Sequence, residues 1–135
     1  MYFSENYAAD LLFYFDRRPE ELALYQALFR QMEAAFPDAS VKVQKTQISF
    51  CGRHLFAAAS LPARRRKEWP ETCILVTFGL SYKKESPRIA VAVEPYPNRW
   101  THHVVLSDEA EADGELLDWL REAWDFSQTK GRGKK

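Results

Sequence analysis

Two stretches of the chain place apolar residues three and four positions apart, which is the spacing of one face of an α-helix. The first begins at Pro19, with Glu20 and Glu21 in the expected first turn, and ends before Pro37. Its stripe is Leu22, Tyr25, Phe29, Met32 and Phe36. The second starts after a cap at Ser107 or Asp113, with the stripe Leu116, Trp119, Leu120, Ala123 and Trp124. The pattern predicts an N-terminal and a C-terminal helix.

Between these helices the apolar residues follow the two-residue period of β-strands. We expect strands over residues 41–50, 55–61, 72–80 and 99–106, with Gly52 and Arg53 in a tight turn. The segment 86–94 fits a further strand or a short helix, because its β-branched residues favour a strand and its alanines weaken that interpretation. Pro95 and Pro97 are expected to interrupt this segment.

The stretch 41–50 changes parity in its middle. Its valines lie on one face of an extended strand, whereas Ile48 and Phe50 lie on the other. This change requires either a β-bulge near residues 44–46 or a sheet that is buried on both faces. Bulges are common beside functional sites, so the pattern marks Lys45 as a candidate functional residue.

The order helix, strands, helix predicts an α+β fold, an antiparallel sheet of about four to five strands packed by the two helices. We expect one domain over residues 1–127, in which the aromatic-rich segment 1–18 forms an arm or a short helix. This segment covers either a partner subunit or its own core, and both possibilities stay open. Residues 128–135 contain no apolar residue and two glycines, which predicts a disordered basic tail.

Composition narrows the class of protein. The 135 residues include 19 basic and 19 acidic side chains, and this balance argues against a dedicated nucleic-acid-binding protein. Cys51 and Cys73 lack the spacing of a metal or redox motif, and we interpret them as small buried residues; a disulfide stays open. No signal peptide or membrane-length apolar run is present, so we expect a cytoplasmic protein without membrane contact.

Three motifs stand in order along the chain. They are Gln44-Lys45-Thr46-Gln47-Ile48-Ser49-Phe50, Ser86-Pro87-Arg88-Ile89 and Trp100-Thr101-His102-His103-Val104-Val105-Leu106. With these motifs, residues 19–126 resemble a bacterial family of small domains of unknown function. The resemblance implies no established activity. Some members carry a cysteine-containing, metal-type module ahead of the domain; this sequence contains none, so no zinc role carries over.

A candidate anion-binding site follows from these motifs. We expect Lys45, Thr46, Arg88 and His103 to converge at one end or face of the sheet, with Trp100 as an aromatic wall. Two cations and an imidazole suit a carboxylate or phosphate ligand. The alternative is a solvated lysine, a surface histidine, and an Arg88 that pairs with Glu94 or Asp113.

The two adjacent histidines do not predict a metal site. His102 and His103 point to opposite faces of a strand, with His102 the more buried, and His54 is the only other histidine. We therefore expect no metal and no cofactor. Candidate nucleophiles such as Ser49, Ser86 and Cys51 lie in no catalytic motif, which favours a binding module over an enzyme.

The expected function is an accessory module that binds a small anion or an acidic protein segment. One alternative is a nucleic-acid accessory that uses the basic loop Arg64-Arg65-Arg66-Lys67, with Trp69 available to stack on a base. The other alternative is an enzyme whose site lies outside known motifs. The sequence sets no oligomeric state.

Overall fold

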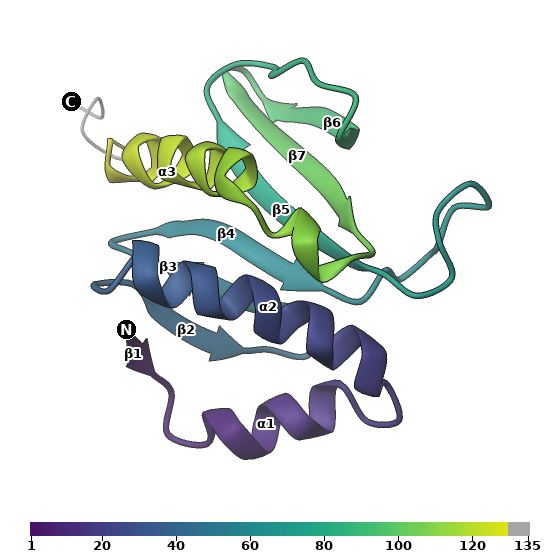
Figure 1. The fold of residues 1–135 in the computed structure, drawn as a ribbon. Helices are drawn as coiled ribbons and strands as arrows, with labels where there is room; N and C mark the ends of the chain where they lie inside the picture. Colours follow the sequence, from purple (N-terminus) through teal and green to yellow (C-terminus); the bar gives the residue numbers. More distant parts are fainter. Residues whose placement is uncertain (130–135) are drawn as a thin grey trace.

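The structure is a computed structural model that describes residues 1–129 (Figure 1). Its elements, in chain order, are β1 (Tyr2–Phe3), α1 (Tyr7–Tyr14), α2 (Pro19–Ala35), β2 (Ser40–Val43), β3 (Ile48–Cys51), β4 (Leu55–Ser60), β5 (Ile74–Leu80), β6 (Ile89–Tyr96), β7 (Arg99–Leu106), a 3₁₀ turn (Glu109–Glu111) and α3 (Gly114–Gln128). No helix in this part of the chain is long and apolar enough to cross a membrane.

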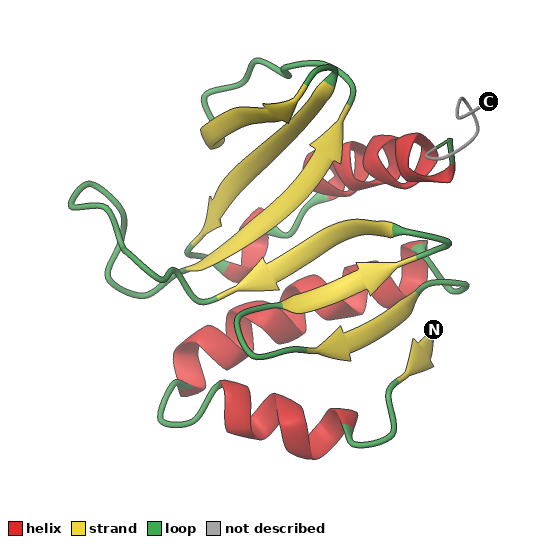
Figure 2. Cartoon of the chain, turned by 180° about the vertical axis from the view of Figure 1, so that it is seen from behind, coloured by secondary structure: helices red, strands yellow, loops and turns green. Residues whose placement is uncertain are grey.

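The strands form one seven-stranded sheet in the order β1-β2-β3-β4-β5-β7-β6. All neighbouring strands are antiparallel except β1 and β2, which are parallel. The helices lie on one face of the sheet, and Figure 2 shows the other face without a helix over it. The predicted α+β class with helices on one face is therefore confirmed. The predicted four to five strands are an undercount.

One missed strand comes from the parity change in 41–50. The structure has no bulge at residues 44–46: the chain reverses there, and β2 and β3 form a hairpin closed by a 2.8 Å hydrogen bond from the Gln44 amide to the Gln47 carbonyl. Val41 faces Phe50 across this hairpin. Paired residues of antiparallel strands share a face, so the two parities belong to two strands and meet on the buried face.

The other missed strand is the two-residue β1, which is followed by α1. The N-terminal segment is thus a short strand and a short helix, and it packs on its own domain. Leu11 and Phe15 belong to the hydrophobic core, and the hydroxyls of Tyr7 and Tyr25 are 2.8 Å apart. At the other terminus, α3 continues to Gln128, the first residue of the predicted tail. The prediction of disorder for 130–135 lies outside the described residues.

The segment 86–94 is a strand, as one of the two predicted alternatives had it. Strand β6 continues through Pro95, contrary to the prediction that this proline interrupts the segment. A proline is tolerated here because β6 is the last strand of the sheet, and an edge strand leaves part of its amide groups unpaired. The ladder to β7 is irregular between Val93 and Tyr96. The β6–β7 turn then contains Asn98, at a φ of 62°.

A genuine β-bulge lies one hairpin further along, between β3 and β4. Phe50 pairs with Ala57 and Cys51 pairs with Leu55, so Phe56 is an extra residue in β4. The bulge turns Phe56 to the helix side, where its ring centroid lies 4.9 Å from that of Phe36. Leu55 stays on the helix-free side and is exposed. This bulge shapes both faces of the sheet.

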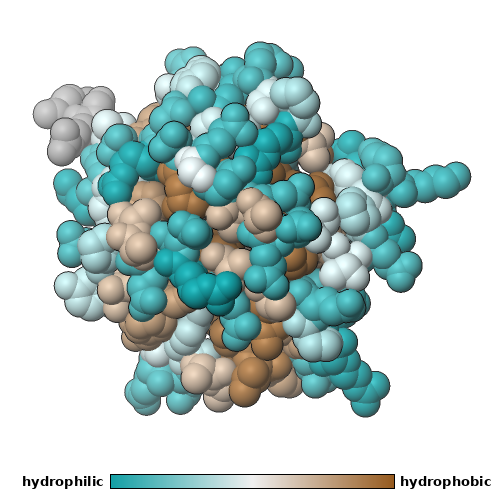
Figure 3. Space-filling view, in the orientation of Figure 1, coloured by the Kyte–Doolittle hydropathy of each residue, from teal (hydrophilic) through white to brown (hydrophobic). Residues whose placement is uncertain are grey.

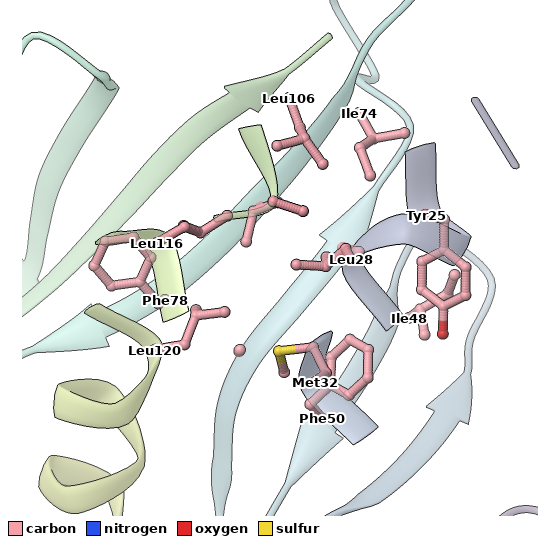
Figure 4. Close-up of a cluster of buried hydrophobic side chains, with 14 of the residues drawn as sticks. Tyr25, Leu28, Met32, Ile48, Phe50, Ile74, Phe78, Leu106, Leu116 and Leu120 are labelled. Carbon is pink, nitrogen blue, oxygen red and sulfur yellow. The ribbon is translucent and has the colours of Figure 1, made fainter. Parts of the chain in front are cut away.

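The core lies between the helices and the sheet (Figure 4). The stripes of α2 and α3 meet the inward-facing residues of β3, β5 and β7 there. The fully buried side chains in this layer include Tyr25, Leu28, Met32, Ile48, Phe50, Ile74, Phe78, Leu106, Leu116 and Leu120. Burying each such side chain contributes roughly 1.5–3 kcal/mol. The predicted helix stripes are confirmed in part: Leu22, Phe29 and Trp124 are only partly buried, and α2 also buries Leu24 and Leu28. Both cysteines are free thiols.

Candidate functional site

A pocket of about 640 Å³ lies at the end of the sheet where β2 turns into β3. Three segments form it: α1, the β2–β3 turn, and the chain that leaves β4. The lining residues are Asp10, Phe13, Tyr14, Val43, Gln44, Lys45, Thr46, Leu61, Pro62 and Ala63. The volume is in the range of about 300–1,000 Å³ that is usual for small-molecule sites. We call this the Lys45 pocket.

Tyr14 holds the three segments together. Its hydroxyl donates to the Thr46 carbonyl at 3.0 Å and accepts from the Leu61 amide at 3.0 Å. Burial raises the pKa of this phenol, with the Leu61 hydrogen bond acting in the opposite direction, so the group stays neutral. The hydroxyl therefore fixes the position of the turn relative to β4, and the pocket is preformed.

The walls of the Lys45 pocket are mostly apolar. Phe13 is 84% exposed and forms one side, while Val43, Leu61 and Pro62 form the others. An apolar side chain as exposed as Phe13 has no stabilising role in the core. Figure 3, in the orientation of Figure 1, shows apolar surface in the region of α1.

Two charged side chains of opposite sign line the same pocket, Lys45 from the turn and Asp10 from α1. Neither makes an ion pair with another residue in the described part of the chain. Lys45 and Thr46 are both exposed. The pocket thus offers one unpaired ammonium group and one unpaired carboxylate above apolar walls.

Arg88 lies far from this pocket. It precedes β6, at the same end of the sheet as the β2–β3 turn but near the opposite edge, with β4, β5 and β7 in between. Its Nη1 donates to Asp113 Oδ1 at 2.9 Å and to Glu115 Oε1 at 3.0 Å, and its Nη2 donates to the Glu111 carbonyl at 2.7 Å. The pairing with Asp113 is the alternative that the sequence had left open. Arg88 ties β6 to the start of α3.

Trp100 and His103 also lie elsewhere. Trp100 is near the start of β7, where the Lys83 ammonium is 5.9 Å from its ring centroid. His103 is on the helix-free face, and its Nδ1 is 2.9 Å from the Thr77 hydroxyl. The structure therefore brings together Lys45 and Thr46, and it places Arg88, Trp100 and His103 at three other locations.

His102 lies on the helix side of β7 and is the more buried of the two adjacent histidines, as predicted. It is fully buried, and its Nε2 accepts a 3.0 Å hydrogen bond from the Lys84 amide. Within residues 1–129 no cluster of three or more His, Cys, Asp or Glu side chains has the arrangement of a metal site.

The basic loop that follows β4 is folded on itself. Arg64 and Lys67 are exposed, and Arg65 Nη1 donates to the Trp69 carbonyl at 2.9 Å. The guanidinium of Arg66 lies 5.6 Å from the Trp69 ring centroid. One face of the indole is therefore covered by an arginine, and a base that stacks on that face has to displace it.

Sequence reasoning missed the apolar half of the Lys45 pocket. Phe13, Tyr14 and Leu61 were assigned to an arm and to a strand end, because their proximity to Lys45 arises only from tertiary packing. The available signal was the run of three aromatic residues at 13–15, of which only Phe15 is buried in the core.

Replacement of Arg88 tests its structural role. We expect Arg88→Ala to lower the free energy of unfolding by about 1–2 kcal/mol, because three acceptors at the start of α3 lose a charged donor while remaining partly solvated. Urea denaturation measures the loss. Arg64→Ala, at an exposed residue of the loop after β4, is the comparison and should cost less. An equal loss in both variants contradicts this role.

The fold and the pocket together define a class: an α+β protein with a preformed, mostly apolar pocket at one end of a mostly antiparallel sheet. Residues 13–127 match the family model described as a domain of unknown function, DUF5655. The chain belongs to this family. Comparisons with curated proteins and with solved structures gave no significant match.

Proposed function

We propose that the domain is a binding module for a small amphiphilic molecule with a single carboxylate, held in the Lys45 pocket. The observation that carries the proposal is the unpaired Lys45 ammonium at the rim of an apolar, preformed pocket of about 640 Å³. Binding sites for small molecules combine apolar walls with a few polar groups in this way.

The apolar walls select the body of the ligand. The side chains of these walls, Phe13, Val43, Leu61 and Pro62, form no hydrogen bonds. A hydrocarbon chain or an aryl ring gives up no hydrogen bonds to water when it moves into the pocket, so such a group is favoured there. The Tyr14 hydroxyl already donates its hydrogen bond to the Thr46 carbonyl and accepts one from the Leu61 amide. The polar end of the ligand therefore has to meet the rim, where Lys45 and Asp10 lie.

The charges at the rim select the polar end. Lys45 favours an anion, while Asp10 repels one, so the pocket has no net charge to offset a multiply charged phosphate. The single negative charge of a monocarboxylate can pair with the Lys45 ammonium while the rest of the ligand, which is uncharged, lies near Asp10. This argument favours aryl or fatty carboxylates over nucleotides and over an acidic protein segment.

The test compares a carboxylate with the alcohol of the same skeleton. We expect 3-phenylpropionate to bind more tightly than 3-phenylpropanol by isothermal titration calorimetry, and ATP to bind no better than the alcohol. Lys45→Met should lower the affinity for the carboxylate about tenfold, which is the effect of one lost hydrogen bond to a charged group. The affinity for the alcohol should not change. Octanoate serves as the aliphatic probe.

Two further variants make the result specific. Lys42→Met removes an exposed lysine three residues away on β2, outside the pocket, and should leave all affinities unchanged. Phe13→Ala should weaken carboxylate and alcohol alike without loss of stability, because the ring is already exposed. The proposal fails if no carboxylate binds, or if Lys45→Met and Lys42→Met behave alike.

A further inference from the structure

The helix-free face of the sheet has a hollow over the second half of β5. Its volume is about 140 Å³, and its lining residues are Gln47, Leu55, Phe56, Ala57, Ala58, Thr77, Phe78, Gly79 and Thr101. It is separate from the Lys45 pocket, with which it shares no lining residue. Nothing in the proposed function uses it.

Two features of the backbone create the hollow. Gly79 lies within β5, in a regular ladder with β7, and presents no side chain to either face. On the neighbouring strand the β4 bulge turns Phe56 to the helix side. A glycine inside a strand lowers its stability and often marks a place where a ligand approaches closely. A β-carbon at Gly79 would meet only the Trp100 carbonyl, at 3.8 Å, so the space above Gly79 is open.

The polar groups around the hollow are neutral and held in place. Gln47 Nε2 donates to the Ser49 hydroxyl at 2.9 Å, and that hydroxyl donates to Gln44 Oε1, which leaves Gln47 Oε1 as an acceptor. On the other side, the Thr77 hydroxyl is 2.9 Å from His103 Nδ1. Ser49 and Ala58 are only 6% and 4% exposed although no helix covers this face, so neighbouring side chains shield them from solvent, while Gln47 and Thr77 are half-buried.

The electrostatics of the hollow disfavour an ion. None of its lining residues carries a charge. The Thr77 hydroxyl contacts one titratable side chain, that of His103; burial lowers the pKa of His103, which stays neutral near pH 7. A charged ligand would lose its hydration and find no opposite charge in the hollow. An uncharged ligand can replace its hydrogen bonds to water with hydrogen bonds to the Gln47 amide and the threonine hydroxyls.

We propose that the hollow over Gly79 binds a small uncharged heteroaromatic ring that both donates and accepts hydrogen bonds, the chemistry shared by nucleobases and nicotinamide. At about 30 Å³ per water, 140 Å³ equals four to five water molecules, which is the size of one such ring. The small residues Ala58 and Gly79 provide a floor on which a flat ring lies, and Leu55 provides an apolar side.

The experiment is an NMR titration that follows the backbone amides of Thr77, Gly79 and Thr101. The probes are uracil, nicotinamide and nicotinate; nicotinate has the same ring as nicotinamide but a charged carboxylate. We expect uracil or nicotinamide to shift these three amides in a saturable way. Nicotinate should bind at least about tenfold more weakly, because its charge has no partner in the hollow.

Gly79→Val is the decisive variant. The valine β-carbon has room here, and the side chain should fill the hollow and abolish the shifts, while thermal unfolding shows an unchanged or higher Tm. Thr77→Val keeps the shape and removes one hydroxyl, and it should weaken binding about tenfold. Val93→Thr, on the same face at β6 and outside the hollow, should have no effect.

Three results overturn the proposal. They are no shift at the three amides with either neutral ring, equal affinity for nicotinamide and nicotinate, or unchanged binding in Gly79→Val. If Gly79→Val failed to fold, Thr77→Val and the comparison of the two nicotinic ligands still decide the question. Because the two pockets share no lining residue, Lys45→Met should leave these titrations unchanged.

Discussion

Lowering the pH from about 7 to about 5 should destabilise this domain substantially, and His102 should cause much of the loss. The imidazole is fully buried on the helix side of β7, stacked on Phe78 at a ring-centroid distance of 5.0 Å. Its Nε2 accepts from the Lys84 amide, which requires an unprotonated nitrogen. Protonation would therefore break this hydrogen bond and place a charge in the core.

The pKa of His102 is lowered in the folded protein. Burial is the main cause; the positive charge of Lys84, and that of His103 where it is protonated at acidic pH, lower it further, against opposing contributions from the Phe78 backbone and Glu122. The unfolded chain, with an ordinary histidine pKa of about 6.5, then binds more protons than the folded one at acidic pH. The stabilising effect of the neutral ring is complete above that pH and is lost as the pH falls, by up to about 1.4 kcal/mol per pH unit.

The contributions of other titrating groups to the pH dependence of stability can be distinguished from that of His102 by their pH range or by mutation. The pKa of Asp113 and that of Glu122 are lowered by their ion-pair partners and by hydrogen bonds, although burial opposes this, so their contributions are lost only near pH 4 and below. His103 also has a lowered pKa, through burial, and adds to the loss between pH 7 and 5. His103→Gln measures that share.

Urea denaturation at several pH values between 7 and 5 tests the prediction. His102→Gln keeps an acceptor for the Lys84 amide but does not titrate, so it should be less stable than the native chain at pH 7 and lose less on acidification. His54→Gln, at an exposed turn residue, is the control and should follow the native curve. A native curve that stays flat from pH 7 to 5 contradicts the prediction.

The sequence predicts the parts of the fold that follow from local periodicity. The stripes of α2 and α3, the buried parity of β5 and the opposite orientations of His102 and His103 all depend on residue spacing, which the chain itself displays. The parity change in 41–50 is visible in the sequence, but its cause is a hairpin and not a bulge. A hairpin and a bulge give the same parity signal, and the turn residues Gln44, Lys45, Thr46 and Gln47 include no glycine, asparagine or proline.

What the sequence did not predict depends on long-range packing. Strand β1 has two residues, too few for any period to be visible. Tyr14 reaches Thr46 and Leu61, 32 and 47 residues away, so only the folded chain shows that α1 closes the Lys45 pocket. The sequence motifs and their residue types place Arg88 and Lys45 in one expected site, whereas the sheet order puts the two near opposite edges. Residue type identifies candidate chemistry, whereas strand order decides which candidates meet.

Phe56→Ala should cost the domain about 3–5 kcal/mol, the usual range for a large buried aromatic residue that is replaced by alanine. Phe56 is 3% exposed and lies between two aromatic rings, with centroids 4.9 Å from Phe36 and 5.1 Å from Trp124. Its removal leaves a cavity where α2, α3 and β4 meet, and a domain of this size has only about 5–15 kcal/mol of stability in total. Urea denaturation, with midpoint and slope compared, measures the loss.

The neighbouring residue is the matched control, because the β4 bulge sends the two side chains to opposite faces. Leu55 is 44% exposed on the helix-free side, so Leu55→Ala should cost less than about 1 kcal/mol. If β4 had no bulge at Phe56, regular pairing with β5 would place Phe56 on the helix-free side with Gly79, and its ring would occupy the hollow there. A small loss in Phe56→Ala together with a large one in Leu55→Ala would therefore contradict both the bulge and the hollow that depends on it.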